Sequence, residues 1–134
     1  MKTFHLQIVT PDRTVFDGDA ESFLVRTATG DVQILAGHAD MLAAVGVGKA
    51  KITADGKERA ASCAGGFLTV EGGAVRLVGT TFEFADEIDL DRARRAKERA
   101  EEKIRAAKDA QTLDLAKAKL ARALSRIAVA EHPV

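Results

Sequence analysis

The spacing of hydrophobic positions changes near residue 87, and this change divides the chain into two predicted domains. Before that point, short segments such as Phe4 to Val9 alternate apolar and polar residues, which is the period of a half-buried strand. After it, apolar residues recur at steps of three and four, which is the period of an amphipathic helix. The pattern predicts a β-rich domain over residues 1–86 and a helical domain over residues 87–134.

The first domain contains seven or more short strand segments that are separated by turn residues. Asp55-Gly56 and Gly72-Gly73 each stand between two segments and indicate two-residue hairpins, because both central residues of such turns need positive φ. Strands at this spacing predict an antiparallel sandwich or barrel. The segments are 4–9, 14–16, 22–27, 32–35, 49–53, 57–62, 67–71 and 74–78.

The second domain reads as two helices with a short polar link, which predicts an antiparallel helical hairpin. Asp89 is placed to cap the first helix, and Thr112 or Asp114 is placed to cap the second. The first apolar stripe is mostly alanine, so its burial removes little apolar area from water and favours a movable hairpin. The two stripes comprise Ala93, Ala96, Ala100, Ile104 and Ala107, and then Leu113, Ala116, Leu120, Leu124 and Ile127.

Charge is distributed unevenly, although the net charge of the 134 residues is zero. Residues 1–88 carry 8 Lys and Arg against 12 Asp and Glu, a balance of −4. Residues 89–126 carry 12 Lys and Arg against 7 Asp and Glu, a balance of +5. This asymmetry is typical of a helical surface that meets an acidic partner or polyphosphate, or of a solvated helical face.

Most kinds of chemical site find no support in the residue pattern. The histidines, His5, His38 and His132, lack nearby Cys or carboxylate partners at metal-ligand spacing, and no serine lies in a nucleophile motif. The single cysteine, Cys63, lies among small residues and reads as a buried core residue. The histidine and serine patterns therefore indicate neither a metal site nor a catalytic site. The helical half has no aromatic residue to stack on bases, so we do not expect nucleic-acid binding either. No segment has the apolar length of a membrane span.

Four arginines are spaced to gather on the inner side of the predicted hairpin. Arg92 and Arg99 are seven residues apart, and Arg122 and Arg126 are four apart, so each pair lies on one helical face. A phosphate chain would relieve the repulsion between their guanidinium groups, and Asp89 could accept a hydrogen bond from a base or a ribose. Spacing alone favours the alternative, in which the arginines face solvent.

The order and spacing of seven short stretches resemble the epsilon subunit family of bacterial F-type ATP synthase over essentially the whole chain. The chain departs from the usual pattern at Ala36, where relatives have Pro, and at Gln33, where they often have Gly. The stretches are Leu6 to Arg13, Val15 to Gly18, Ile34 to Ala39, Gly65 to Leu68, Glu87 to Asp89, Ala96 to Glu101 and Ala121 to Leu124.

The resemblance implies a ten-stranded sandwich and a helical hairpin in a rotor subunit that performs no catalysis itself. It implies docking on the gamma subunit and the c-ring, at the cytoplasmic face of the bacterial inner membrane. It also implies a hairpin that extends toward an acidic segment of the beta subunit and hinders ATP hydrolysis. The candidate contacts for that segment are Arg94, Arg95, Lys97, Lys103, Arg105 and Lys108, with Lys117 and Lys119 as further candidates.

Some members of this family bind ATP through a motif I/L-D-x-x-R-A, which matches Ile88 to Ala93 in this chain. The resemblance therefore implies ATP as a regulatory ligand of the folded hairpin, with no required cofactor. The implied ATP-binding residues are Glu83, Ile88, Asp89, Arg92, Ala93, Arg99, Arg122 and Arg126. A free-standing ATP-binding sensor is the alternative class of protein.

Overall fold

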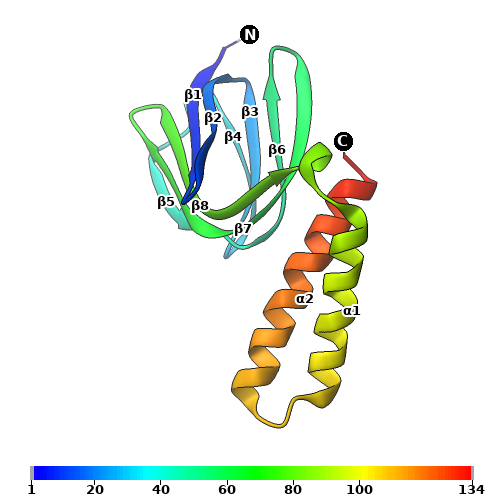
Figure 1. Ribbon diagram of the computed structural model, residues 1–134. Coiled ribbons are helices and arrows are strands. Elements are labelled where there is room, and N and C mark those ends of the chain that lie inside the picture. Colours follow the sequence, from blue (N-terminus) through cyan, green and yellow to red (C-terminus); the bar gives the residue numbers. More distant parts are fainter. Residues whose placement is uncertain (1, 134) are drawn as a thin grey trace.

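The computed structural model describes residues 2–133 as eight strands followed by a short 3-10 turn and two helices (Figure 1). Met1 and Val134, the outer ends of the two predicted domains, lie outside the described residues. The strands are β1 Phe4–Thr10, β2 Arg13–Ala20, β3 Ser22–Thr27, β4 Gly30–Leu35, β5 Met41–Ala44, β6 Val47–Ala54, β7 Lys57–Glu71 and β8 Ala74–Phe84.

The strands form one continuous hydrogen-bonded sheet that folds over into a sandwich. Its order is β2-β1-β8-β7-β6-β3-β4, and β5 pairs with β7. The structure has eight strands instead of the ten that the family resemblance implied, and residues 57–62 and 67–71, two segments in the sequence pattern, belong to one long strand, β7. One pairing departs from the antiparallel prediction: β1 and β8 run parallel. The α+β class is confirmed, and β5 is a strand that the sequence pattern missed.

A pairing irregularity lets β7 and β8 contribute to both layers of the sandwich. The register passes from Ala64↔Thr81 to Gly66↔Gly79 and skips one residue on each strand. The buried positions change phase there, from Phe82 and Phe84 to residues 75 and 77 in β8. The register itself does not shift, but Gly65 and Gly66 both have positive φ, and these two residues interrupt the regular alternation of side chains along β7. The core is thus built only from strand and loop residues within 4–84.

The irregularity depends on a glycine at position 66. Gly66 has φ +116°, and a Cβ placed there would overlap the carbonyl oxygen of Val78. Close packing of the backbones of β7 and β8 therefore requires a glycine at this position. The hairpin turn at Asp55-Gly56 is confirmed, with positive φ at both residues.

Residues 60–64 of β7 are buried on both faces of the sheet. Cys63 faces the core, and its burial raises the pKa of the thiol to about 12, so the prediction of a buried cysteine is confirmed. Alternate side chains of a strand point to opposite faces, so Ser62 points away from this core. It hydrogen-bonds to Ser125 of the last helix at 2.8 Å. The small side chains allow a helix to lie close to this part of the sheet.

The linker between the sheet and the helices is fixed by polar contacts. The turn η1, Ala85–Glu87, follows β8 directly, and Glu87 accepts a hydrogen bond from the backbone N of Phe84 at 3.0 Å. Arg13, in β2, forms an ion pair with Glu87 at 2.9 Å. This pair lowers the pKa of the Glu87 carboxyl, since the arginine stabilises the charged form. The linker is therefore tied to the first β-hairpin.

Both helices begin with an aspartate cap. Helix α1 is Leu90–Ala106, and Asp89 accepts a hydrogen bond from Arg92 N, as predicted. Helix α2 is Ala110–Glu131, and its cap is Asp109, which accepts a hydrogen bond from Thr112 N at 2.7 Å. The prediction of Thr112 or Asp114 as this cap was therefore wrong. With Asp109 as its cap, α2 begins at Ala110, earlier than predicted, and only a short link remains between Ala106 and the second helix.

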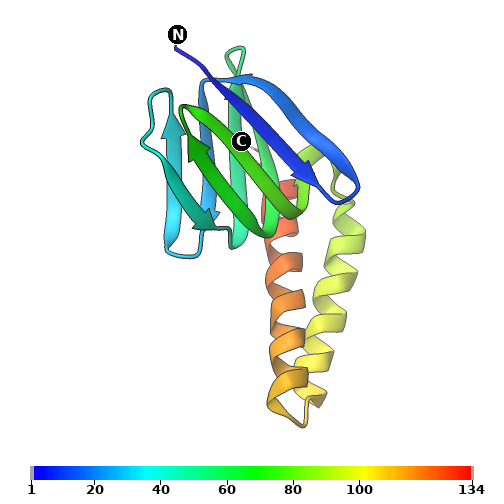
Figure 2. The ribbon, with the colours of Figure 1, turned by 90° about the vertical axis from the view of Figure 1, so that its left-hand side faces the viewer.

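The two helices run antiparallel, and α2 carries most of the contact with the strands. Figures 1 and 2 show that the loop between the helices lies far from the sandwich, while the start of α1 and the end of α2 lie beside it. Ala93, Ala100 and Ala116 are buried as the stripes predicted. Leu124 is 45% exposed, whereas its neighbour Ala123 is buried, so the α2 stripe was assigned one residue too far at this one position.

The close approach at Gly66 predicts a large loss of stability on substitution. We expect Gly66→Ala to lower the free energy of unfolding by at least about 2 kcal/mol, because it adds a steric overlap to an unfavourable φ. The matched control is Gly56→Ala, which also has positive φ but open space around it, and should cost about 1 kcal/mol. Urea unfolding of both variants measures the difference, and equal losses would contradict the packing argument.

The confinement of the core to the sheet predicts that the two-domain division is real. A chain ending at residue 87 should fold, because none of the core residues belongs to a helix. We expect a cooperative thermal transition with a lowered midpoint, since removal of α2 exposes Ala60, Ser62 and Ala64. Circular dichroism and dispersed amide resonances test this. An unfolded fragment would show that the strands need the hairpin.

Candidate functional site

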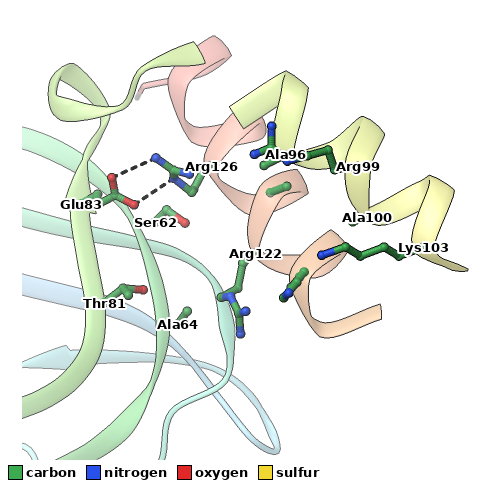
Figure 3. Close-up of a pocket in the computed structure, with 12 residues that line it drawn as sticks. Ser62, Ala64, Thr81, Glu83, Ala96, Arg99, Ala100, Lys103, Arg122 and Arg126 are labelled. Atoms are coloured by element: carbon green, nitrogen blue, oxygen red, sulfur yellow. Dashed lines mark hydrogen bonds and ion pairs between the residues drawn. The ribbon is translucent and has the colours of Figure 1, made fainter. Parts of the chain in front are cut away.

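A cleft of about 370 Å³ lies between the sandwich and the helical hairpin (Figure 3). Strands β7 and β8 form one wall and the two helices form the other. The sandwich contributes Ser62, Ala64, Thr81 and Glu83, and the helices contribute Ala96, Arg99, Ala100, Lys103, Lys119, Arg122, Ala123 and Arg126.

Alanines make this cleft possible. Ala96, Ala100 and Ala123 are small residues on the helix surfaces that line it. A larger apolar side chain at these positions would fill the space between the helices and the strands. Figure 3 shows Arg99 and Lys103 extending from α1 toward α2, and Arg122 extending from α2 toward the strands.

The cleft is strongly cationic. Five Lys and Arg side chains line it, against one carboxylate, that of Glu83. The pKa of Lys119 is lowered, first by Lys103 and then by its desolvation and by Arg122. A lowered lysine pKa means that the neighbouring charges disfavour the ammonium form. Three of the four arginines expected to converge line the cleft, without Arg92, and two lysines join them; the repulsion among these charges is unfavourable without an anion.

Arg126 is the one cleft cation that has an acidic partner within residues 2–133. Its Nη2 donates a hydrogen bond to Glu83 Oε2 at 3.3 Å, and its Nε lies 2.9 Å from Oε1. The Nε–H is poorly aligned with the carboxylate, so this buried nitrogen has no hydrogen-bond partner among the described residues. Glu83 is therefore the acidic neighbour of this nitrogen, which is too buried to reach solvent.

Few polar contacts hold the hairpin in place beside the cleft. Ser62 and Ser125 share a hydrogen bond next to the Glu83–Arg126 pair. Lys49 Nζ donates to the carbonyl oxygen of His132 at 3.2 Å. These contacts place the end of α2 against the sheet, so Arg126 is positioned by the sandwich as well as by its helix.

The structure brings together only part of the predicted ATP-binding set. Glu83, Arg99, Arg122 and Arg126 line the cleft. The motif residues Ile88, Asp89, Arg92 and Ala93 do not line it. Asp89 is engaged as the cap of α1, Ala93 is buried, and Arg92 is exposed, one helical turn from Ala96.

The basic residues predicted to meet the beta subunit fall into different environments. Arg94 forms ion pairs with Glu131 at 3.4 Å and with Asp91 at 4.0 Å. Lys103 lines the cleft. No ion pair within residues 2–133 involves the other four, which are Arg95, Lys97, Arg105 and Lys108.

The sequence reasoning missed the cleft positions of Lys103, Lys119, Ser62 and Thr81. A signal existed for the lysines: Lys103 follows Arg99 by four residues, and Lys119 precedes Arg126 by seven, so each continues an arginine face. No such signal existed for Ser62 and Thr81, because only the docking of the helices brings them to the cleft.

An apolar row crosses the outer surface of four neighbouring strands. Phe67 pairs with Ala44 and Val78, and Val78 pairs with Val9, so these side chains share one face. Leu42 joins them two residues before Ala44. Leu42 is 72% exposed and Phe67 is 60% exposed. An apolar group of this extent on a surface is typical of a contact with another protein.

Other kinds of site have no support in the described residues. No cluster of His, Cys, Asp or Glu in residues 2–133 is arranged to hold a metal ion. Neither of the two described helices is long and apolar enough to cross a membrane.

Comparison with known proteins identifies the family. Residues 3–85 match the family described as "ATP synthase, Delta/Epsilon chain, beta-sandwich domain". Residues 86–131 match "ATP synthase, Delta/Epsilon chain, long alpha-helix domain". A protein named "ATP synthase epsilon chain" from Caldanaerobacter subterraneus is 41% identical over 130 residues, covering 96% of this chain and 94% of that protein. One of the same name from Ruminococcus albus is 40% identical, covering 97% and 98%.

Solved structures agree with the fold. A chain in the Euglena gracilis mitochondrial ATP synthase structure (OSCP/F1/c-ring) has a TM-score of 0.84 at 22% identity, covering 97% of this chain and 82% of that one. A chain in the central stalk/c-ring structure from Tetrahymena thermophila has a TM-score of 0.69 at 13% identity, covering 96% and 97%. On these matches along nearly its whole length, the chain belongs to the delta/epsilon chain family of ATP synthase, as a non-catalytic subunit.

Proposed function

We propose that this chain is a rotor subunit of the central stalk of a bacterial ATP synthase, and that ATP is a regulatory ligand of its hairpin. In this role it couples proton flow to ATP synthesis and restrains ATP hydrolysis. It would lie at the cytoplasmic face of the inner membrane, held there by other subunits. The family assignment supports the place in the complex, and the cationic cleft is the observation that carries the regulatory part.

The apolar row supports docking on the gamma subunit, with the c-ring as a further neighbour. Phe67, Leu42 and Val78 are exposed side chains on the outer surface of the sheet. Their burial against a partner would contribute roughly 25 cal/mol per Å² of apolar area removed from water. A free-standing sensor would have no use for this row, which makes the stalk role the better reading.

The cleft supports binding of the phosphate chain of ATP. Arg99 and Arg122 approach from different helices without an acidic partner among the described residues, and Arg126, which is paired with Glu83, lines the same cleft. Phosphate oxygens accept charge-assisted, often bidentate hydrogen bonds from guanidinium groups. The family motif is the basis for including Ile88, Asp89, Arg92 and Ala93 among the ATP-binding residues. For these residues to contact ATP, the start of α1 must move, or the ligand must extend to it.

ATP would act by favouring the closed hairpin. A ligand shifts a conformational balance only through its different affinities for the two states. The cleft has walls on both helices and on the sandwich, so an extended hairpin would lose most of the contacts. In the extended state, Arg95, Lys97, Arg105 and Lys108 would be available to an acidic segment of the beta subunit and would hinder hydrolysis.

The ATP proposal predicts specific losses of affinity. Arg122→Ala and Arg126→Ala should each weaken ATP binding by roughly 1.5–3 kcal/mol, the contribution of hydrogen bonds to charged groups. Arg105→Ala removes the same charge from α1 outside the cleft and should leave the affinity within about 0.5 kcal/mol. Isothermal titration of the isolated chain measures all three. Unchanged curves for both cleft variants would exclude this site.

The stalk proposal predicts that one apolar side chain controls assembly. Phe67→Glu places a charge in the middle of the apolar row, where its desolvation on docking costs several kcal/mol. We expect the variant to fold but to lose co-purification with the gamma subunit. Leu115→Glu is the control, because Leu115 is equally 60% exposed but lies on α2. Retention of gamma by the Phe67 variant would place the interface elsewhere.

A further inference from the structure

We propose that Lys103 and Lys119 form a subsite for the outermost phosphate of the ligand and thereby select a triphosphate over a diphosphate. The inference rests on the proposed function, because it concerns the same cleft. Lys103 had been assigned to a partner protein from sequence, and Lys119 was only a further candidate for that contact. Their positions in the structure suggest a different role.

The cations are arranged in order along the cleft. Lys119 precedes Arg126 by seven residues on α2, which corresponds to about 10 Å along a helix axis. Lys103 follows Arg99 by four residues on α1, or about 6 Å in the same direction, toward the loop between the helices. Arg99 and Arg126 thus lie toward the sandwich end of the two helices, the lysines lie toward the loop between the helices, and Arg122 lies between Arg126 and Lys119. A phosphate chain placed among the arginines reaches the lysines only if it is long enough.

The single carboxylate fixes the direction of the ligand. Glu83 lies at the sandwich end of the cleft, beside Arg126, where it offsets one positive charge and repels a phosphate. The same carboxylate accepts hydrogen bonds, which suits a ribose hydroxyl or a base amino group. The excess positive charge lies at the lysine end. The nucleoside therefore belongs near Glu83, and the terminal phosphate belongs near the lysines.

The positive charges of Lys103 and Lys119 repel each other when no anion lies between them. The pKa of Lys119 is lowered chiefly by Lys103, with a smaller effect of Arg122. No carboxylate in residues 2–133 forms an ion pair with either lysine. A terminal phosphate carries more negative charge than an inner one. Its electrostatic attraction to the protein is therefore greatest where two ammonium groups have no acidic partner. A diphosphate that ends among the arginines gains nothing from them.

The test compares ligands that differ in the length of their phosphate chain. Lys103→Ala, Lys119→Ala and the wild-type chain are titrated with ATP, ADP, inorganic tripolyphosphate and pyrophosphate. We expect each substitution to weaken ATP and tripolyphosphate binding by about tenfold, the lower end for a hydrogen bond to a charged group at an exposed site. ADP and pyrophosphate binding should change by less than about twofold.

Two further variants separate a direct contact from a general effect of charge. Lys117→Ala removes a lysine from α2 outside the cleft and should leave all four affinities unchanged. Lys119→Arg keeps the positive charge in the cleft and should keep the preference for ATP over ADP. Thermal unfolding without ligand checks that every variant remains folded.

Three outcomes overturn the proposal. One is a rise or no change in ATP affinity on lysine substitution, which would mean that the pair only strains the closed hairpin. Another is an equal loss for ATP and ADP, which would mean that the lysines do not distinguish chain length. In both cases the loss of ATP binding in Arg122→Ala would still uphold the proposed function. Absence of ATP binding by the wild-type chain overturns both proposals together.

Discussion

The mutual repulsion of cations in a small cleft is the constraint on which the behaviour of the hairpin depends. Closing the helices brings five positive side chains together with one carboxylate. The opposing contributions include buried alanines and Val129, the hydrogen bond between Ser62 and Ser125, the contact of Lys49 with the His132 carbonyl oxygen, and one partly exposed ion pair. Neither a surface ion pair nor a neutral hydrogen bond contributes much more than about 1 kcal/mol. A balance of this kind responds to a bound anion.

Arg126 connects the ligand site with the docking of the hairpin. It lines the cleft from α2, and its guanidinium is held by Glu83 of β8. An anion that binds the Arg126 guanidinium therefore contacts a group that already links the sandwich to the hairpin. The serine pair at Ser62 and Ser125 lies beside it and adds a second short link. In the proposed function, ligand binding and helix docking would be parts of one equilibrium.

Much of the architecture could be predicted from the sequence because it follows from periodicity. The change of spacing near residue 87 separates strands from helices, and Asp89 caps α1 as its position indicates. The number of strands could not be derived from periodicity. The passage of β7 and β8 between layers depends on backbone contact at Gly66, which no periodicity records. The second cap was missed because Asp109, Thr112 and Asp114 are all competent caps, and only helix packing decides among them.

The candidate site was predictable where it follows helical spacing and not where it needs the sheet. Arg99, Arg122 and Arg126 lie in the cleft as their spacing suggested, but Arg92, on the same face, stays outside it. The wall formed by Ser62 and Thr81 depends on long-range docking. The length of β7 has a mechanical consequence here. Ser62 and Phe67 lie on one uninterrupted strand, so the floor of the cleft keeps a constant position relative to whatever covers Phe67. The rotor would carry that floor as a rigid platform, and the helices alone would move upon it.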